Sequence, residues 1–290
     1  MARSTLAALC FTLFPAGAAI AEDSFKAGPE KSGYNLLNPT PSEMMRELSA
    51  DRPDKTDCPF TVDAGHFQVE MDIANLTYDR ADSDQKSKRF AAYEIAPMNL
   101  KVGLLNNLDF QLIYSIFRWQ QTKDRDAGTI VHTSSFESVT PRLKLNLTGN
   151  DGGFFALALL PFVKLPLHQQ HIDNGEVEGG IGIPFAFDVP DWDVGFQSTF
   201  RLNHDDVGPG YHSVFDNSVS IGHSLIGKLS VAVEFFSSVS DEQEADWIGT
   251  FDTWLTYQVN KNLRLDGGAY IGVTAEADDW HPFIGMTWRF

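Results

Sequence analysis

Apolar and polar residues alternate along most of this chain, and this two-residue period is the feature that most constrains its fold. Successive side chains of a β-strand point to opposite faces, so the alternation predicts strands with one apolar and one mixed polar face. The closing stretch, residues 280–290, places apolar side chains on one such face: Pro282, Ile284, Met286, Trp288 and Phe290. From about Gly65 onward the pattern predicts twelve strands, near residues 66–79, 90–104, 107–119, 135–148, 153–166, 176–188, 192–203, 211–225, 227–238, 246–259, 261–274 and 280–290. In the second and the eighth of these, the inward side is ambiguous.

The connections between the predicted strands alternate in length. Tight turns rich in Asn, Asp, Gly and Pro lie at residues 106–107, 149–152, 190–191, 226–227 and 260–261. Longer polar segments lie near residues 80–89, 120–134, 167–175, 204–210, 239–245 and 275–279. Short turns on one side and longer loops on the other are typical of bacterial outer-membrane barrels with both termini in the periplasm. The sequence therefore predicts an all-β fold, a transmembrane antiparallel up-and-down β-barrel of about 12 strands. A soluble all-β domain, the alternative, has no reason to sort its loops by side.

The N-terminal region divides into two parts before the barrel. Residues 1–21 combine one early basic residue, a mostly apolar stretch and a small-residue cleavage site, which indicates a secretory signal peptide. Residues 22–62 do not alternate and are expected to form a periplasmic or plug segment, ahead of a barrel over residues 63–290. Within that segment, Thr40 and Glu43 are spaced as a capping box and predict a short helix. A partial plug of the periplasmic mouth and a flexible lead-in both fit this segment.

The charge, the cysteine content and the apolar runs of the chain argue against several kinds of partner and structure. The formal net charge is −17, which argues against a nucleic-acid partner. Beyond residue 21 only Cys58 remains, so no disulfide within the chain frames the fold. No later segment has eighteen unbroken apolar residues, so the sequence predicts no membrane-spanning helix.

The strand faces predicted to point inward carry both signs of charge. Lumen-lining candidates are Glu70, Asp109, Arg142, Lys144, Lys164, Arg201, Glu234, Asp252, Arg264, Asp266 and Arg289. The same parity places Phe154, Phe162, Phe236, Tyr270 and Phe283 inward. A barrel of twelve strands has a backbone diameter of roughly 24 Å, reduced to on the order of 10–12 Å by inward side chains. Two interpretations fit: internal ion pairs that stiffen the barrel, or an eyelet that orients a small polar or aromatic solute.

One stretch carries a family resemblance. Residues 48–72 read L-S-A-D-R-P-D-K-T-D-C-P-F-T-V-D-A-G-H-F-Q-V-E-M-D, and residues 97–104 read P-M-N-L-K-V-G-L. The D-R-P-D-K-T core, the P-F-T-V step, the G-x-F-x-x-E strand start and the terminal Phe290 resemble the outer-membrane barrels grouped as meta-pathway phenol-degradation transporters. The resemblance covers about residues 40–290, and Cys58 departs from it by standing where a small polar residue is expected. It implies placement in the outer membrane and a transporter-like role.

Other functions find less support in the sequence. It contains neither a G-x-S-x-G elbow nor an H-E-x-x-H motif, and no third partner is evident for Ser198 and His223, so no catalytic residue is assigned and an outer-membrane hydrolase is the least favoured alternative. A structural or adhesive barrel is the other alternative. His168 and His171 could bind a divalent ion, but loop spacing fixes no geometry, so no metal and no cofactor are assigned.

The expected function is an outer-membrane channel or transporter-like barrel that passes a small solute by passive diffusion. Outer-membrane lipid and lipopolysaccharide are expected partners, and so is the outer-membrane assembly machinery, for which Phe290 is the predicted assembly signal.

Overall fold

The structure is a computed structural model, and it describes residues 30–80, 88–124, 127–135, 138–167, 175–205, 208–243 and 245–290. The predicted signal peptide lies outside these residues. The strands are β1 (Phe67–Asp79), β2 (Lys88–Leu105), β3 (Leu108–Asp124), β4 (Thr129–Ser135), β5 (Val139–Thr148), β6 (Phe155–Lys164), β7 (Glu178–Val189), β8 (Trp192–His204), β9 (Tyr211–Ile226), β10 (Leu229–Ser240), β11 (Ile248–Asn260), β12 (Leu263–Gly272) and β13 (Trp280–Arg289). Within the described ranges, no helix is long and apolar enough to cross a membrane.

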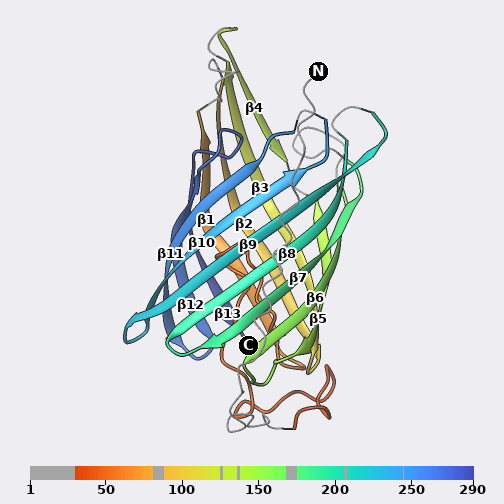
Figure 1. Cartoon of the computed structure of the whole chain (residues 1–290), viewed down its shortest axis with the longest axis vertical. Coiled ribbons are helices and arrows are strands. Elements are labelled where there is room, and N and C mark those ends of the chain that lie inside the picture. The colour runs from red at the N-terminus through yellow and green to blue at the C-terminus, as the bar shows by residue number, and fades with distance from the viewer. Residues whose placement is uncertain are drawn as a thin grey trace, which may run out of the picture.

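The strands close into a ring. Neighbours in the chain pair antiparallel, except that β4 and β5 both pair with β3 and not with each other. β1 pairs with both β2 and β13, and β2 pairs with β3, so the sheet returns to its start. Figure 1 shows the strands tilted around a cylinder, with the C-terminus at the end that carries the short turns. Closure pairs the backbone groups of every strand within the sheet, which is what a lipid environment demands. The predicted all-β barrel is confirmed.

The twelve-strand count is also confirmed, because β4 and β5 act as one interrupted strand. Arg118 of β3 pairs with Ser135 of β4, and Tyr114 of β3 pairs with Val139 of β5. Tyr114 and Arg118 lie four positions apart in the sequence, and so do Ser135 and Val139. The register therefore continues unchanged from β4 to β5. The expected loop over residues 120–134 was wrong: β3 and β4 form a hairpin arm there, which rises beyond the barrel at the end opposite the C-terminus (Figure 1).

The ambiguous face of the second predicted strand has a structural cause. In β1 the register shifts between Asp72 and Ala74, so Asp72 and then Asn75 point inward. In β2 the inward side changes from Lys101 to Glu94, and Ala96 between them has a φ of 52°. An irregular residue of this kind reverses the side on which all later residues lie. Simple alternation therefore fails within β2.

The outer wall is apolar, with aromatic residues toward both ends. At the short-turn end, the Phe290 ring stacks on Phe67 with centroids 5.9 Å apart. At the long-loop end, Tyr93 stacks on Trp119 with centroids 5.0 Å apart, and Trp280 is exposed nearby. Leu76 and Ile284 on the wall are more than half exposed. Such a surface, with aromatic residues at both margins, matches the lipid-facing band of an outer-membrane barrel.

The short helix predicted around Thr40 is absent. Only one turn forms there, in which Met44 N donates to Pro41 O at 2.9 Å. Thr40 N instead donates to Ala64 O at 2.9 Å, and the ring of His66 contacts Thr40 O at 2.8 Å. Because these contacts engage the backbone from outside the segment, the tertiary environment overrides the local capping signal.

Candidate functional site

Residues 46–63, called here the lumen segment, lie inside the barrel. Arg46 Nη1 donates to Asn106 and Asp151 in two different short turns, at 2.9 Å each. Thr56 Oγ1 accepts from the Ser218 hydroxyl of β9 at 2.7 Å. Further partners come from strands around the ring, which only an interior segment can reach at once. Figure 1 shows this part of the chain as an orange coil surrounded by the strands.

An eight-residue loop, Asp51 to Cys58, forms the centre of the lumen segment. Cys58 N donates to Asp51 Oδ1 at 3.1 Å, which closes the loop on itself. The Asp51 carboxylate also meets three cations from the wall: Lys101 Nζ at 2.5 Å, Arg142 Nη2 at 3.1 Å and Lys144 Nζ. Lys101 belongs to β2 and the other two to β5, so one carboxylate binds two separate strands to the lumen segment.

Arg52 binds the opposite part of the wall. Its guanidinium donates to Asp72 of β1 at 2.5 Å and to both oxygens of Asp266 of β12, at 2.6 and 3.1 Å. A bidentate pair of this kind fixes orientation as well as charge. Gly285 of β13 leaves the necessary space, because a Cβ added there would lie 2.2 Å from Arg52 Nη2.

The next residues cross to the far side of the lumen. Lys55 Nζ pairs with Asp252 of β11 at 2.7 Å. Glu234 of β10 accepts from Lys55 N at 2.9 Å, from Thr56 N at 2.8 Å and from the Thr56 hydroxyl. Asp57 pairs with Arg142 at 3.0 Å. The charged side chains Asp51, Arg52, Lys55 and Asp57 are thus each matched by opposite charges on the wall.

The structure places the lumen candidates predicted from the sequence in two groups. Nine contact the lumen segment through hydrogen bonds or ion pairs: Glu70, Asp109, Arg142, Lys144, Glu234, Asp252, Arg264, Asp266 and Arg289. The other two pair within the wall: Lys164 with Glu178 at 3.0 Å, and Arg201 with Asp216 at 2.7 Å. Of the inward aromatic residues, Phe154 was predicted wrongly: it precedes β6, is 65% exposed and packs against Phe187.

Sequence reasoning missed the inner half of this network. It treated the wall charges as pairing with one another or facing solute, whereas many of them pair with residues 51–57. A signal was present: the D-R-P-D-K-T-D run alternates in charge, lies just before the first strand and lacks the period of a strand or helix. A charged run usually faces water. Only the many charged residues on the inward strand faces indicated that this run could lie inside the barrel instead.

A cavity of about 1010 Å³ lies beside the lumen segment at the short-turn end. The segment forms one side of it, and small side chains of β6 to β10 form much of the other: Ala156, Ala186, Gly195, Ser220, Gly222, Ser230 and Ala232. A volume of this size is at the upper end of the range of small-molecule sites.

The Lys55 ammonium, which pairs with Asp252, also lies close to two aromatic rings. Its Nζ lies 4.1 Å from the centroid of Tyr270 and 5.0 Å from that of Phe236. Phe283 lies against Tyr270 with centroids 4.7 Å apart. A cation held over two rings is favourable when shielded from water, so these aromatics help to hold the lumen segment. The same rings present flat apolar surface within the lumen.

A second cluster of ion pairs lies at the short-turn end of the barrel and connects the N-terminal region to a short turn. Asp151 pairs with Lys31 at 2.8 Å and with Arg46 at 2.9 Å. Burial raises the pKa of Asp151, but the hydrogen bonds from Lys31 and Asn106 and the charge of Arg46 outweigh it, so this pKa lies below its usual value. The carboxylate therefore stays ionised at neutral pH, and this contribution to stability is lost only as the pH falls through that lowered pKa.

The residues considered for a hydrolase and for a loop metal site can also be placed. Ser198 and His223 do not meet: Ser198 Oγ donates to Asn217 at 3.0 Å, and the ring of His223 packs against Trp192. These two residues therefore do not form a nucleophile and base pair. His168 and His171 lie outside the described residues.

A closed antiparallel ring with an apolar outer wall and a charged interior defines an outer-membrane β-barrel. Within that class, the chain belongs to the family described as "Putative MetA-pathway of phenol degradation", whose model matches residues 50–290. The predicted family is thus confirmed. None of the curated protein sequences compared with the chain matches it.

Solved structures with a similar fold include several outer-membrane proteins. The NanC porin is 8% identical, with a TM-score of 0.49, and the match covers 77% of this chain and 98% of the porin. A loop-deletion mutant of OmpT, an outer membrane protein of Vibrio cholerae, is 8% identical, with a TM-score of 0.38 and coverage of 78% and 98%. A further porin is 9% identical, with a TM-score of 0.37 and coverage of 78% and 99%.

Proposed function

We propose that this protein is an outer-membrane channel that passes a small solute down its concentration gradient and is closed at rest by its own lumen segment. The observation that carries the proposal is the loop Asp51–Cys58, in which Asp51, Arg52, Lys55 and Asp57 pair with wall charges and which reaches β1, β2, β5, β8, β10, β11 and β12 across the lumen. A purely structural barrel could fill its interior with wall residues alone. A separate segment held by reversible ion pairs is suited to a channel that opens.

The solute class follows from what lies beside the lumen segment. The cavity of about 1010 Å³, whose lining includes the rings of Phe60 and Trp254, would accept a small molecule with a flat apolar part and a polar group. An aromatic solute with one polar substituent fits this description, and the link of the family to phenol degradation supports the same class.

The orientation proposed here places both ends of the barrel-forming chain in the periplasm. The short turns and the C-terminal end of β13 lie at one end of the barrel. The β3–β4 arm and the acidic connections, which carry Asp205, Asp241, Asp246 and Asp279, lie at the other. Short turns at the periplasmic end and longer loops at the outer end are general in outer-membrane barrels. The acidic connections would then face lipopolysaccharide. Phe290, whose ring lies on the outer wall beside Phe67, would be read by the outer-membrane assembly machinery.

The test is planar-bilayer conductance of the purified mature chain, compared with a variant lacking residues 30–62 but secreted with the same signal. The variant should conduct in steps several times larger than any shown by the full chain, because the cross-links to the wall are gone. Unboiled samples should still migrate differently from boiled ones on gels, which shows that the barrel remains folded. Equal conductance in folded samples of both proteins would refute closure by the lumen segment.

A structural or adhesive barrel remains the second candidate. It predicts silence in the bilayer for both proteins. Lipid hydrolysis by a silent protein would instead point to an enzyme.

A further inference from the structure

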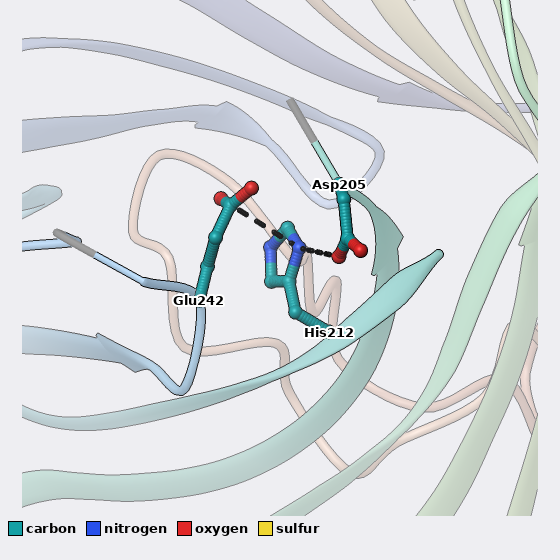
Figure 2. A group of neighbouring side chains, drawn as sticks. All are labelled: Asp205, His212 and Glu242. Carbon is teal, nitrogen blue, oxygen red and sulfur yellow. Dashed lines mark hydrogen bonds and ion pairs between the residues drawn. The ribbon is translucent and has the colours of Figure 1, made fainter. Parts of the chain in front are cut away.

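Asp205, His212 and Glu242 converge at the long-loop end of the barrel, and we infer that they form a divalent-metal site. Asp205 follows the last residue of β8, His212 is the second residue of β9, and Glu242 comes two residues after β10. One ligand atom of each lies within 4.8 Å of the others. Figure 2 shows the two carboxylates approaching the imidazole from either side. The site is separate from the lumen segment and joins two neighbouring connections.

The distances suit a single ion. His212 Nδ1 lies 3.1 Å from Asp205 Oδ1 and 3.6 Å from Glu242 Oε2. A zinc-like ion holds nitrogen and oxygen ligands at about 2.0–2.2 Å, so neighbouring ligand atoms in its shell are roughly 3.0–3.6 Å apart. Both distances from the imidazole already fall there, so the carboxylates need only close on each other. The remaining positions of the ion would hold water.

The backbone holds each ligand in place before any ion binds. Asp205 N donates to Gly210 O at 3.0 Å, and a Cβ at Gly210 would lie 2.1 Å from Asp205 Oδ2. Position 210 must therefore lack a side chain for this carboxylate to lie where it does. On the other side, Asp241 N donates to Ser213 O at 3.0 Å, and Ser213 N donates to Asp241 Oδ1 at 2.6 Å. This double contact fixes Glu242 beside β9.

The donor set selects the kind of ion. One imidazole with two carboxylates is a mixed nitrogen and oxygen set, which favours Zn²⁺ and similar transition metals over Ca²⁺, because calcium prefers oxygen alone. Residues 204–210 and 239–245 contain acidic residues but no Lys or Arg, so a dication would meet little local repulsion. A protonated His212 could instead pair with the carboxylates, and the experiment must separate that case.

The experiment is titration calorimetry of the full-length mature protein in detergent, after removal of metal by a chelator, with Zn²⁺ and then Ca²⁺ as the probe. We expect one Zn²⁺ per chain with micromolar affinity or better, and at least tenfold weaker binding of Ca²⁺. The variant His212→Ala should lose Zn²⁺ binding at least tenfold. Thermal unfolding of the wild type, but not of His212→Ala, should shift upward with Zn²⁺, because the ion binds two connections together.

Two control variants make the test specific. Asp246→Asn removes a carboxylate from the same β10–β11 connection outside the cluster, and it should bind Zn²⁺ like the wild type. The double variant His168→Ala, His171→Ala removes histidines from another connection and should also bind normally. Zn²⁺ binding that persists in His212→Ala, that is lost in the double variant, or that is matched by Ca²⁺ would overturn the inference. Absence of Zn²⁺ binding by the wild type would show that His212 only forms an ion pair.

Discussion

At Arg52, one guanidinium reaches two carboxylates on different strands, Asp72 and Asp266, and both contacts are largely shielded from water. Breaking a buried pair by removing one partner costs about 3–5 kcal/mol, because the other charge is left buried and unpaired. In the closed state of the proposed channel Arg52 holds these two carboxylates, and in the open state it does not. The contact therefore bears directly on the balance between them.

Arg52→Ser should favour the open state. From the cost of breaking a buried pair, the closed state should lose a factor on the order of 100 or more relative to the open state. The measurement is open probability in single-channel recordings. Arg201→Ser is the matched control: Arg201 also pairs with one aspartate, Asp216, through two nitrogens, but it does so within the wall. An equal effect of both substitutions would mean that general loosening of the barrel, rather than release of the lumen segment, changes the conductance.

Among the elements, β13 both ends the chain and closes the ring. Phe290 N donates to Phe67 O at 2.9 Å, and Phe67 N donates to Phe290 O at 3.0 Å. The Phe290 ring lies between Phe67 and Trp288 on the outer wall. The last residue therefore completes both the backbone pairing and an exposed aromatic surface, where a factor that inserts barrels could contact it.

Deletion of Phe290 should lower the amount of protein in the outer membrane several-fold. The closing pair and the aromatic surface are lost together, whereas Tyr211→Ala removes an exposed aromatic at the other end of the barrel and should have little effect. Quantitative blotting of outer-membrane fractions measures both. Equal levels of the Phe290 deletion and the wild type would exclude the terminal aromatic as an assembly signal.

The strands were predictable because each faces lipid on one side and a polar interior on the other, so the two-residue period survives in the sequence. The β3–β4 arm was mistaken for a loop, since beyond the membrane no apolar face is required: Ile130 and Val131 of β4 are both exposed, as is His132. The change of side near Ala96 showed in the sequence only as an ambiguous inward face, because one irregular residue reverses the alternation without a composition signal that marks its position. The wall charges could be predicted, but their partners in residues 51–57 depend on tertiary contacts that no local pattern records.

On the scale of the whole molecule, charges are arranged differently inside the barrel and at its long-loop end. Inside, charged residues of the wall form ion pairs with the lumen segment, whereas the connections at the long-loop end carry an excess of carboxylates. The excess is smaller than the sequence suggests, because Glu178 pairs with Lys164 and Asp279 with Arg80. Asp246 and Glu276 remain exposed on these connections. A negative mouth of this kind concentrates cations and repels anions.

The open channel should therefore prefer cations at low salt and lose most of that preference near 1 M. The Debye length is about 10 Å at 0.1 M and about 3 Å at 1 M, so only at the lower concentration does the field of the mouth extend across it. Reversal potentials across a salt gradient, measured on the variant lacking residues 30–62 at two mean concentrations, give the preference. Neutralising Asp246 and Glu276 together should weaken it. A preference that ignores salt would show that charges inside the lumen set the selectivity.

The loop Asp51–Cys58 also constrains the order in which the molecule is built. It precedes every strand in the chain, yet its partners lie on strands from β1 to β12. Once β13 meets β1, the ring is complete, and a loop left outside would have to thread back through a mouth that residues 30–45 help to cover. The segment is therefore available before any strand, and wall charges such as Lys144 and Asp252 can pair with it as the sheet closes.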